Sequence, residues 1–267
     1  MEDIFIVDER KIAARHSMSK NSVITRAKKR HAYRKLCEAD SKDAESWFMV
    51  GVLYGRMGRI AEAEAALRKA LELQPKLAAG YLNLGQALEL QGKLDEADLQ
   101  YTRFVELQPN SADGHDALGR LCQLRGDMRA AIVHHQQAIQ LNPARVATYL
   151  SVARAYQQLG DLEAAAENIA QALRLDVNQA SAYYDLAVVR IDQGRYDEAL
   201  ENVRHALQLK ADYVHAKAVE AYILEHQRDY QGALDCLTPL LDRYPDNPEL
   251  ALVYERLCHF TRDYEGA

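Results

Sequence analysis

Three side chains of the kinds that bind zinc occur close together in the chain: His115, Cys122 and His135. Imidazole nitrogens and thiolates are common ligands of a structural zinc ion, which takes four of them. The three would converge if this stretch folded into two antiparallel helices. The other nearby donors are His134 and Asp116, which we expect to face away. Because a fourth ligand is lacking, we favour a polar, weakly packed patch of hydrogen-bonded imidazoles and predict no metal or other cofactor.

Two arginines, Arg120 and Arg154, are separated by 34 residues. A guanidinium group can donate two parallel hydrogen bonds to one carboxylate or phosphate, so the pair could bind an anionic group of a ligand. Alternatively, each arginine pairs with an acidic residue of its own chain, such as Asp116, Asp185 or a neighbouring glutamate. The sequence leaves both interpretations open.

The motifs of common enzyme classes are missing from the sequence. It contains no phosphate-binding loop, no GxSxG or HExxH motif and no dinucleotide-binding fingerprint. Carboxylates that recur on helix faces are typical of a solvated surface. We therefore predict that this chain is not itself an enzyme.

The spacing of 34 residues runs through most of the chain and indicates an internal repeat. Glycine recurs at this spacing at Gly58, Gly92, Gly126, Gly160 and Gly194. Alanine recurs five residues further on, at Ala63, Ala97, Ala131, Ala165, Ala199 and Ala233. Proline ends several segments, at Pro75, Pro109, Pro143 and Pro245. The repeat predicts six units, 44–77, 78–111, 112–145, 146–179, 180–213 and 214–247.

Each recurring place has a physical reason. A bulky residue at the fourth place, such as Trp47 or Tyr81, is followed by a small one at the eighth, such as Gly51 or Gly85. Small side chains let two helices approach closely. The later glycine suits a bend that needs a positive φ, and proline ends a helix because it cannot continue the hydrogen-bond pattern. Each unit is therefore predicted to be a hairpin of two helices.

The residues that define this pattern are complete in the first unit: Trp47, Val50, Gly51, Tyr54, Ala63, Leu67 and Pro75. They closely resemble the tetratricopeptide repeat, and the resemblance covers residues 44–247. It implies an all-α fold, a right-handed superhelical solenoid of antiparallel helix hairpins. In such a solenoid the first helices line a concave groove, and each unit covers apolar surface of its neighbours.

The resemblance also implies which places of each first helix face the groove. Read onto this sequence, the central ones are Phe48, Val52, Leu82, Asn83, Gln86, Asp116, Arg120, Leu150, Arg154, Tyr184, Asp185 and Tyr222. The amide of Asn83 could both donate to and accept from a peptide backbone. Neither the lysine and asparagine clamp of chaperone-binding arrays nor a full asparagine ladder is present, so the ligand stays unspecified.

These observations predict a scaffold that binds a peptide or a partner-protein segment in the groove. The alternative is the N-terminal, substrate-recruiting arm of a larger transferase-type enzyme whose catalytic domain follows residue 267.

The two ends depart from the repeat. Residues 1–21 show no period and favour disorder over docking onto the groove, whereas 22–43 have the register of a capping helix. Residues 248–267 begin a seventh unit that the sequence does not complete. The apolar face left there could support self-association.

Charge and hydropathy narrow the partners and the compartment. Residues 1–43 hold 11 Lys and Arg against 7 Asp and Glu, a net of +4, and residues 44–267 hold 22 against 32, a net of −10. An acidic body argues against nucleic acid as a partner, and we interpret the basic run 26–35 as a solvated helix face. No apolar run is long enough for a signal peptide or a membrane helix, and the four cysteines have no motif spacing. We therefore predict no membrane partner and a cytoplasmic location.

Overall fold

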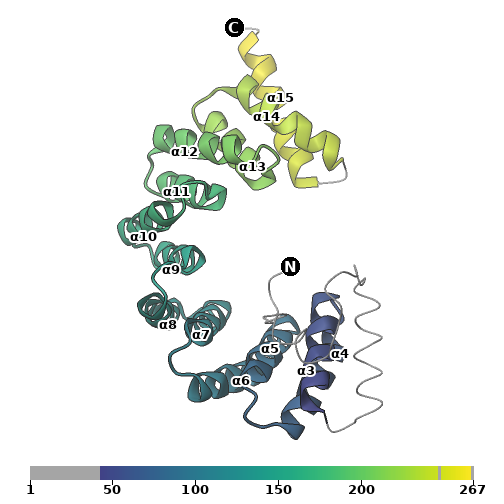
Figure 1. Ribbon diagram of the computed structural model, residues 1–267. Coiled ribbons are helices and arrows are strands. Elements are labelled where there is room, and N and C mark those ends of the chain that lie inside the picture. Colours follow the sequence, from purple (N-terminus) through teal and green to yellow (C-terminus); the bar gives the residue numbers. More distant parts are fainter. Residues whose placement is uncertain (1–42, 246–247, 266–267) are drawn as a thin grey trace, which may run out of the picture. The chain divides into compact units, whose positions relative to one another are not determined.

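The computed structural model describes residues 43–245 and 248–265, and all of their regular elements are helices (Figure 1). The chain divides into two compact units, Met1–Leu141 and Asn142–Ala267, which are taken separately below. The predicted head (1–21) and almost all of the predicted capping segment (22–43) lie outside the described residues. Within the described residues, no helix is both long and apolar enough to cross a membrane.

The described part of the first unit consists of three helix hairpins that follow one another along the chain. Its helices are α3 (Ala44–Arg56), α4 (Ile60–Leu73), α5 (Ala78–Leu90), α6 (Leu94–Leu107), α7 (Ala112–Leu124) and α8 (Met128–Leu141). Each first helix packs against its own second helix, and each second helix packs against the next first helix. One continuous apolar core therefore extends from α3 to α7.

The second unit repeats this arrangement and ends in a single helix. Its helices are α9 (Val146–Gln158), α10 (Leu162–Leu175), α11 (Ala180–Asp192), α12 (Tyr196–Leu209), α13 (Val214–His226), α14 (Tyr230–Arg243) and α15 (Pro248–Glu265). The packing again alternates between partners within a hairpin and neighbours in the stack. The predicted all-α solenoid of antiparallel hairpins is confirmed.

The bends between the two helices of a hairpin follow the glycine pattern. Gly58, Gly92, Gly126, Gly160 and Gly194 all have φ between 74° and 82°, the left-handed region that glycine enters without strain. In the sixth hairpin the same place is held by Arg228, whose φ is 65°. A residue with a Cβ is strained in this region, so the sixth bend stores strain that the other five avoid.

The close crossing of the two helices also follows the sequence. The recurring alanine of the second helix is fully buried in all six hairpins. At the eighth place of the first helix, Gly85 lies so near the second helix that a Cβ would come within 2.4 Å of Tyr101. A larger side chain at these places would push the helices apart.

The residue just after a first helix ties its hairpin to the preceding one. Gln91 donates to Glu64 of α4, and Arg125 donates to Asp95 and Asp98 of α6. In the second unit, Gln193 donates to Glu163 and Gln227 to Asp197. These side-chain bonds help to hold neighbouring hairpins in register.

The last helix departs from the predicted start of a seventh hairpin. α15 has 18 residues, against 13 in each other first helix, and it continues through residue 262, the place where five hairpins bend at glycine. Its eighth residue is Glu255, which is exposed, where the other first helices carry glycine or alanine. A charged side chain at this place does not fit the close approach of a second helix.

Candidate peptide-binding face

The weak candidates for a zinc site, His115, Cys122 and His135, are not grouped around one point. The Nδ1 atom of His135 lies 3.0 Å from Oδ1 of Asp116, and its Nε2 lies 3.4 Å from Oε1 of Gln123. His115 instead stacks on His134, with ring centroids 6.2 Å apart. Within the part of the chain that the structure describes, no three His, Cys, Asp or Glu side chains are grouped to hold a metal ion.

The imidazole of His135 is 1% exposed and has polar partners at both ring nitrogens, as expected of a patch of hydrogen-bonded imidazoles, but the buried Nδ1 atoms of His115 and His134 have no hydrogen-bond partner among the described residues. The expectation that Asp116 faces away from His135 was wrong, because Asp116 turns inward and its carboxylate can accept the Nδ1 proton.

Arg120 is held by a polar network of its own unit. It donates to both carboxylate oxygens of Glu89, at 2.7 and 3.0 Å, and lies 3.3 Å from the hydroxyl of Tyr101. Tyr101 is fully buried and donates to Glu89 at 2.6 Å. Burial raises the pKa of Tyr101, and although burial disfavours a charged Arg120, the hydrogen bonds to Glu89 raise its pKa. The arginine is therefore a structural partner of α5 and α6.

Arg154 pairs with Asp185 in the second unit. Its Nη2 donates to Oδ2 of Asp185 at 2.8 Å. Asp185 is 7% exposed, and burial raises the pKa of its carboxyl group against the opposing effect of Arg154. Both arginines thus have acidic partners within the chain, as in the second interpretation of the sequence.

The predicted groove residues differ in how much surface they offer. Phe48, Val52, Leu82 and Leu150 are each less than a tenth exposed and belong to the apolar cores. Tyr184 is partly buried, 5.2 Å from the ring of Tyr213, and burial raises its pKa. Tyr222 is 50% exposed. The use of these side chains in binding stays a prediction.

Asn83 and Gln86 form the most unusual polar pair of this set. They lie one turn apart on α5 and are 0% and 7% exposed. The Nδ2 of Asn83 donates to the carbonyl oxygen of Ala79 at 2.8 Å, which fixes the orientation of its amide. The Oδ1 of Asn83 and the Oε1 of Gln86 are buried and accept no hydrogen bond from a described residue. Two buried acceptors therefore lack a donor among the described residues, which is uncommon in a folded protein.

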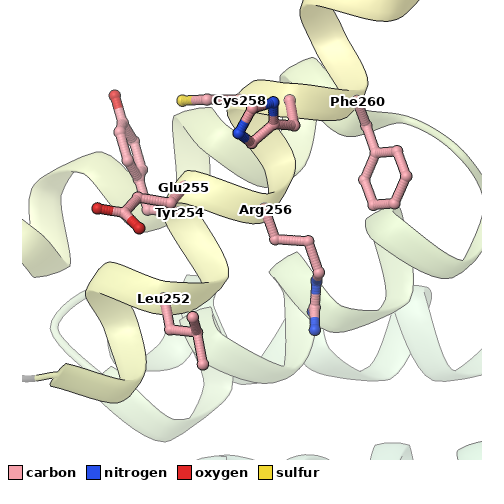
Figure 2. Close-up of a pocket in the computed structure, with 7 residues that line it drawn as sticks. Leu252, Tyr254, Glu255, Arg256, Cys258 and Phe260 are labelled. Atoms are coloured by element: carbon pink, nitrogen blue, oxygen red, sulfur yellow. The ribbon is translucent and has the colours of Figure 1, made fainter.

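A second feature lies on α13, α14 and α15. A cleft of about 380 Å³ is lined by Tyr222, Glu225, His226, Tyr230, Arg256 and Phe260. Figure 2 shows Arg256 and Phe260 projecting from one side of α15 and Tyr254 and Glu255 from the other, beside a further hollow along this helix. Of the residues that line the cleft, only Tyr222 was predicted from the sequence. Continuing the groove places into α15 would have identified Arg256 as the ninth residue and Phe260 as the thirteenth.

Models of known families match four stretches of the chain, all with the description tetratricopeptide repeat. The matched residues are 44–77, 66–98, 152–214 and 190–257. The chain belongs to the tetratricopeptide repeat family. None of the curated protein sequences compared with this repeat protein matches it.

Solved structures share its fold at low sequence identity. The Cut9–Hcn1 hetero-tetramer of the APC/C matches with a TM-score of 0.74 and 17% identity over 93% of this chain, which spans 51% of that chain. PilF of Pseudomonas aeruginosa matches with a TM-score of 0.66 and 21% identity, covering 88% of this chain and 98% of that one. YrrB, described as a TPR protein with an unusual peptide-binding site, matches with a TM-score of 0.55 and 22% identity, covering 69% and 95%.

Proposed function

We propose that this protein is a non-catalytic scaffold that binds an extended segment of a partner protein along its first helices. The observation that carries the proposal is the pair of buried acceptors on α5, Asn83 Oδ1 and Gln86 Oε1. A buried acceptor without a donor destabilises a protein by about 1–3 kcal/mol. Both oxygens are covered in the free chain, so a bound segment whose backbone N–H groups supply the two donors must first displace what covers them.

Other features are consistent with this function. YrrB, which has a similar fold, is described as having a peptide-binding site. The charged side chains of Arg120 and Arg154 are neutralised within the chain, so the proposed segment need not be anionic. A reducing compartment such as the cytoplasm suits the three described cysteines, Cys122, Cys236 and Cys258, which are free.

A peptide selection tests the proposal. A phage-displayed library of random peptides is selected on the immobilised chain, and the affinities of selected peptides are measured by fluorescence anisotropy. We expect Asn83→Leu and Gln86→Leu each to weaken binding by about tenfold, the effect of one lost hydrogen bond. Neither variant should melt at a lower temperature, because each removes an unsatisfied buried oxygen.

Asn168→Leu is the matched control. Asn168 also donates from Nδ2 to the carbonyl oxygen one turn earlier, at 2.8 Å, but it lies on α10, a second helix. This variant should bind the selected peptides as the wild type does. Equal affinity of all three variants, or failure to select any peptide, would contradict the proposal.

A further inference from the structure

The cleft of the second unit brings aromatic side chains from several helices to one place. Tyr230 of α14 and Phe260 of α15 stack with ring centroids 5.0 Å apart and planes inclined by 20°. His226 of α13 stacks on Tyr196 of α12 at 3.7 Å and 14°. Tyr222 of α13 lines the same cleft and is half exposed. Stacking fixes the ring orientations before a ligand arrives, and Phe260 remains 41% exposed beside Tyr222.

The charged residues of the cleft neutralise one another. Arg256 donates from Nη2 to Glu225 at 2.8 Å, and both side chains line the cleft. A charged ligand group would have to compete with this ion pair and would gain little from a wall without net charge. An uncharged ligand with flat apolar faces has no such competition.

We propose that this cleft binds a proline-rich segment of a partner protein in the polyproline II conformation. The pyrrolidine ring is uncharged and packs flat on aromatic rings, which is how proline-rich segments dock in aromatic-lined grooves. The polyproline II helix exists before binding, so ordering it costs little entropy. The inference rests on the proposed function in that the ligand is a protein segment, but it concerns first helices of the second unit, whereas Asn83 and Gln86 lie in the first unit.

The test uses the full chain and a fluorescein-labelled decaproline peptide, with polylysine and polyglutamate peptides of the same length for comparison. We expect decaproline to bind with an affinity that is nearly independent of salt, since the ligand carries no charged side chain. Tyr222→Ala and Phe260→Ala should each weaken it by about tenfold, the loss of one aromatic contact. Circular dichroism checks that each variant is folded.

Tyr244→Ala is the matched control, because Tyr244 is 40% exposed and does not line the cleft. It should leave decaproline binding unchanged. Preference for polylysine or polyglutamate, equal weakening by Tyr244→Ala, or no binding of decaproline would each overturn the inference. If Phe260→Ala instead abolished concentration-dependent light scattering of the free chain, a second copy would be the occupant, and the inference would also fail.

The two proposals can fail independently. Asn83→Leu lies in the first unit and should leave decaproline binding unchanged. Selected peptides that lose affinity with Asn83→Leu, together with no binding of decaproline, would support the proposed function and reject the proline-rich ligand.

Discussion

The two helices of a hairpin approach closely in both units, but different side chains fill the space between them. In the first unit, the eighth place of the first helix is glycine, and the facing residues of the second helix are Leu67, Tyr101 and His135. In the second unit, the eighth place is alanine, and the equivalent residues are Ile169, Val203 and Leu237. The first unit thus exchanges a methyl group on one helix for a ring on the other in two of its three hairpins.

The exchange has a chemical consequence. Each ring in the first unit carries a polar atom into the core, and a carboxylate of the first helix receives it. Tyr101 donates to Glu89, and His135 contacts Asp116. Ile169 and Val203 have no polar atom to satisfy. In these two hairpins, glycine at the eighth place makes room for the ring and the carboxylate satisfies its polar atom, whereas Gly51 of the first hairpin makes room for Leu67.

The largest loss of stability is expected when Tyr101 is replaced by valine, the residue at the equivalent place, Val203, of the second unit. Tyr101→Val removes a fully buried ring and the hydrogen bond to Glu89. We expect the free energy of unfolding to fall by about 3 kcal/mol, the lower end for truncating a buried aromatic residue. Urea unfolding measures the total, and hydrogen exchange shows whether the loss is confined to α5, α6 and α7.

A double-mutant cycle then tests the link to glycine. Gly85→Ala alone should lower the free energy of unfolding by about 1–3 kcal/mol, because its Cβ would meet the ring of Tyr101 at 2.4 Å. In the Tyr101→Val background the same change should lower it much less. Ala187→Gly with Val203 in place is the control from the second unit and should show only a loss of about 0.5–1 kcal/mol. Additive effects of Gly85→Ala and Tyr101→Val would contradict the coupling.

Features that recur from hairpin to hairpin could be predicted from the sequence. The helix hairpins, the positive φ of the bend glycines and the burial of the crossing alanines follow from local rules that act in each unit. The partner of Arg120 could not be predicted in the same way. Whether it meets Glu89 or Asp116 depends on how far neighbouring hairpins are rotated, which no residue pattern within one unit specifies.

The same limit explains the differences at the candidate site. The places of the groove were assigned from one helix at a time, but burial of Phe48 or Leu82 depends on what packs above that helix. Among the residues that the structure describes, none donates to the oxygens of Asn83 and Gln86, and the sequence gives no sign of this. The continuation of α15 past residue 262 could not be predicted from Arg262, because Arg228 replaces the bend glycine one repeat earlier and that hairpin still bends.

Glu64 of the first unit and Asp185 of the second extend the comparison to the dependence of stability on pH. Burial disfavours ionisation of Glu64, but hydrogen bonds from Lys93, Gln91 and Arg68 outweigh it and lower the pKa of Glu64 to about 2. Asp185 has one such donor, Arg154, and burial raises its pKa. Glu64 thus has more donors than Asp185 and is less deeply buried, and both differences act toward a lower pKa for Glu64.

The two shifts predict opposite dependences of stability on pH. A lowered pKa stabilises the folded chain above the unfolded value and the gain is lost as pH falls toward 2, so the deficit of Glu64→Gln should shrink between pH 6 and pH 3. A raised pKa binds the proton more tightly in the folded chain. The stability of the wild type relative to Asp185→Asn should therefore grow as pH falls through the same range. Thermal unfolding at several pH values measures both, and parallel curves for the two variants would refute the donor argument.

The smallest and most local difference lies in the bends between helices, where the fifth hairpin carries Gly194 and the sixth carries Arg228. Gly194 has φ of 74° with nothing within 4 Å of its missing Cβ, so Gly194→Ala changes backbone strain alone. Arg228 holds the same place one hairpin later, with φ of 65° and an exposed side chain. We expect Arg228→Gly to raise the free energy of unfolding by up to about 1 kcal/mol and Gly194→Ala to lower it by a similar amount. Urea unfolding midpoints measure both; a lower midpoint for Arg228→Gly would mean that contacts of the arginine outweigh the strain of its backbone.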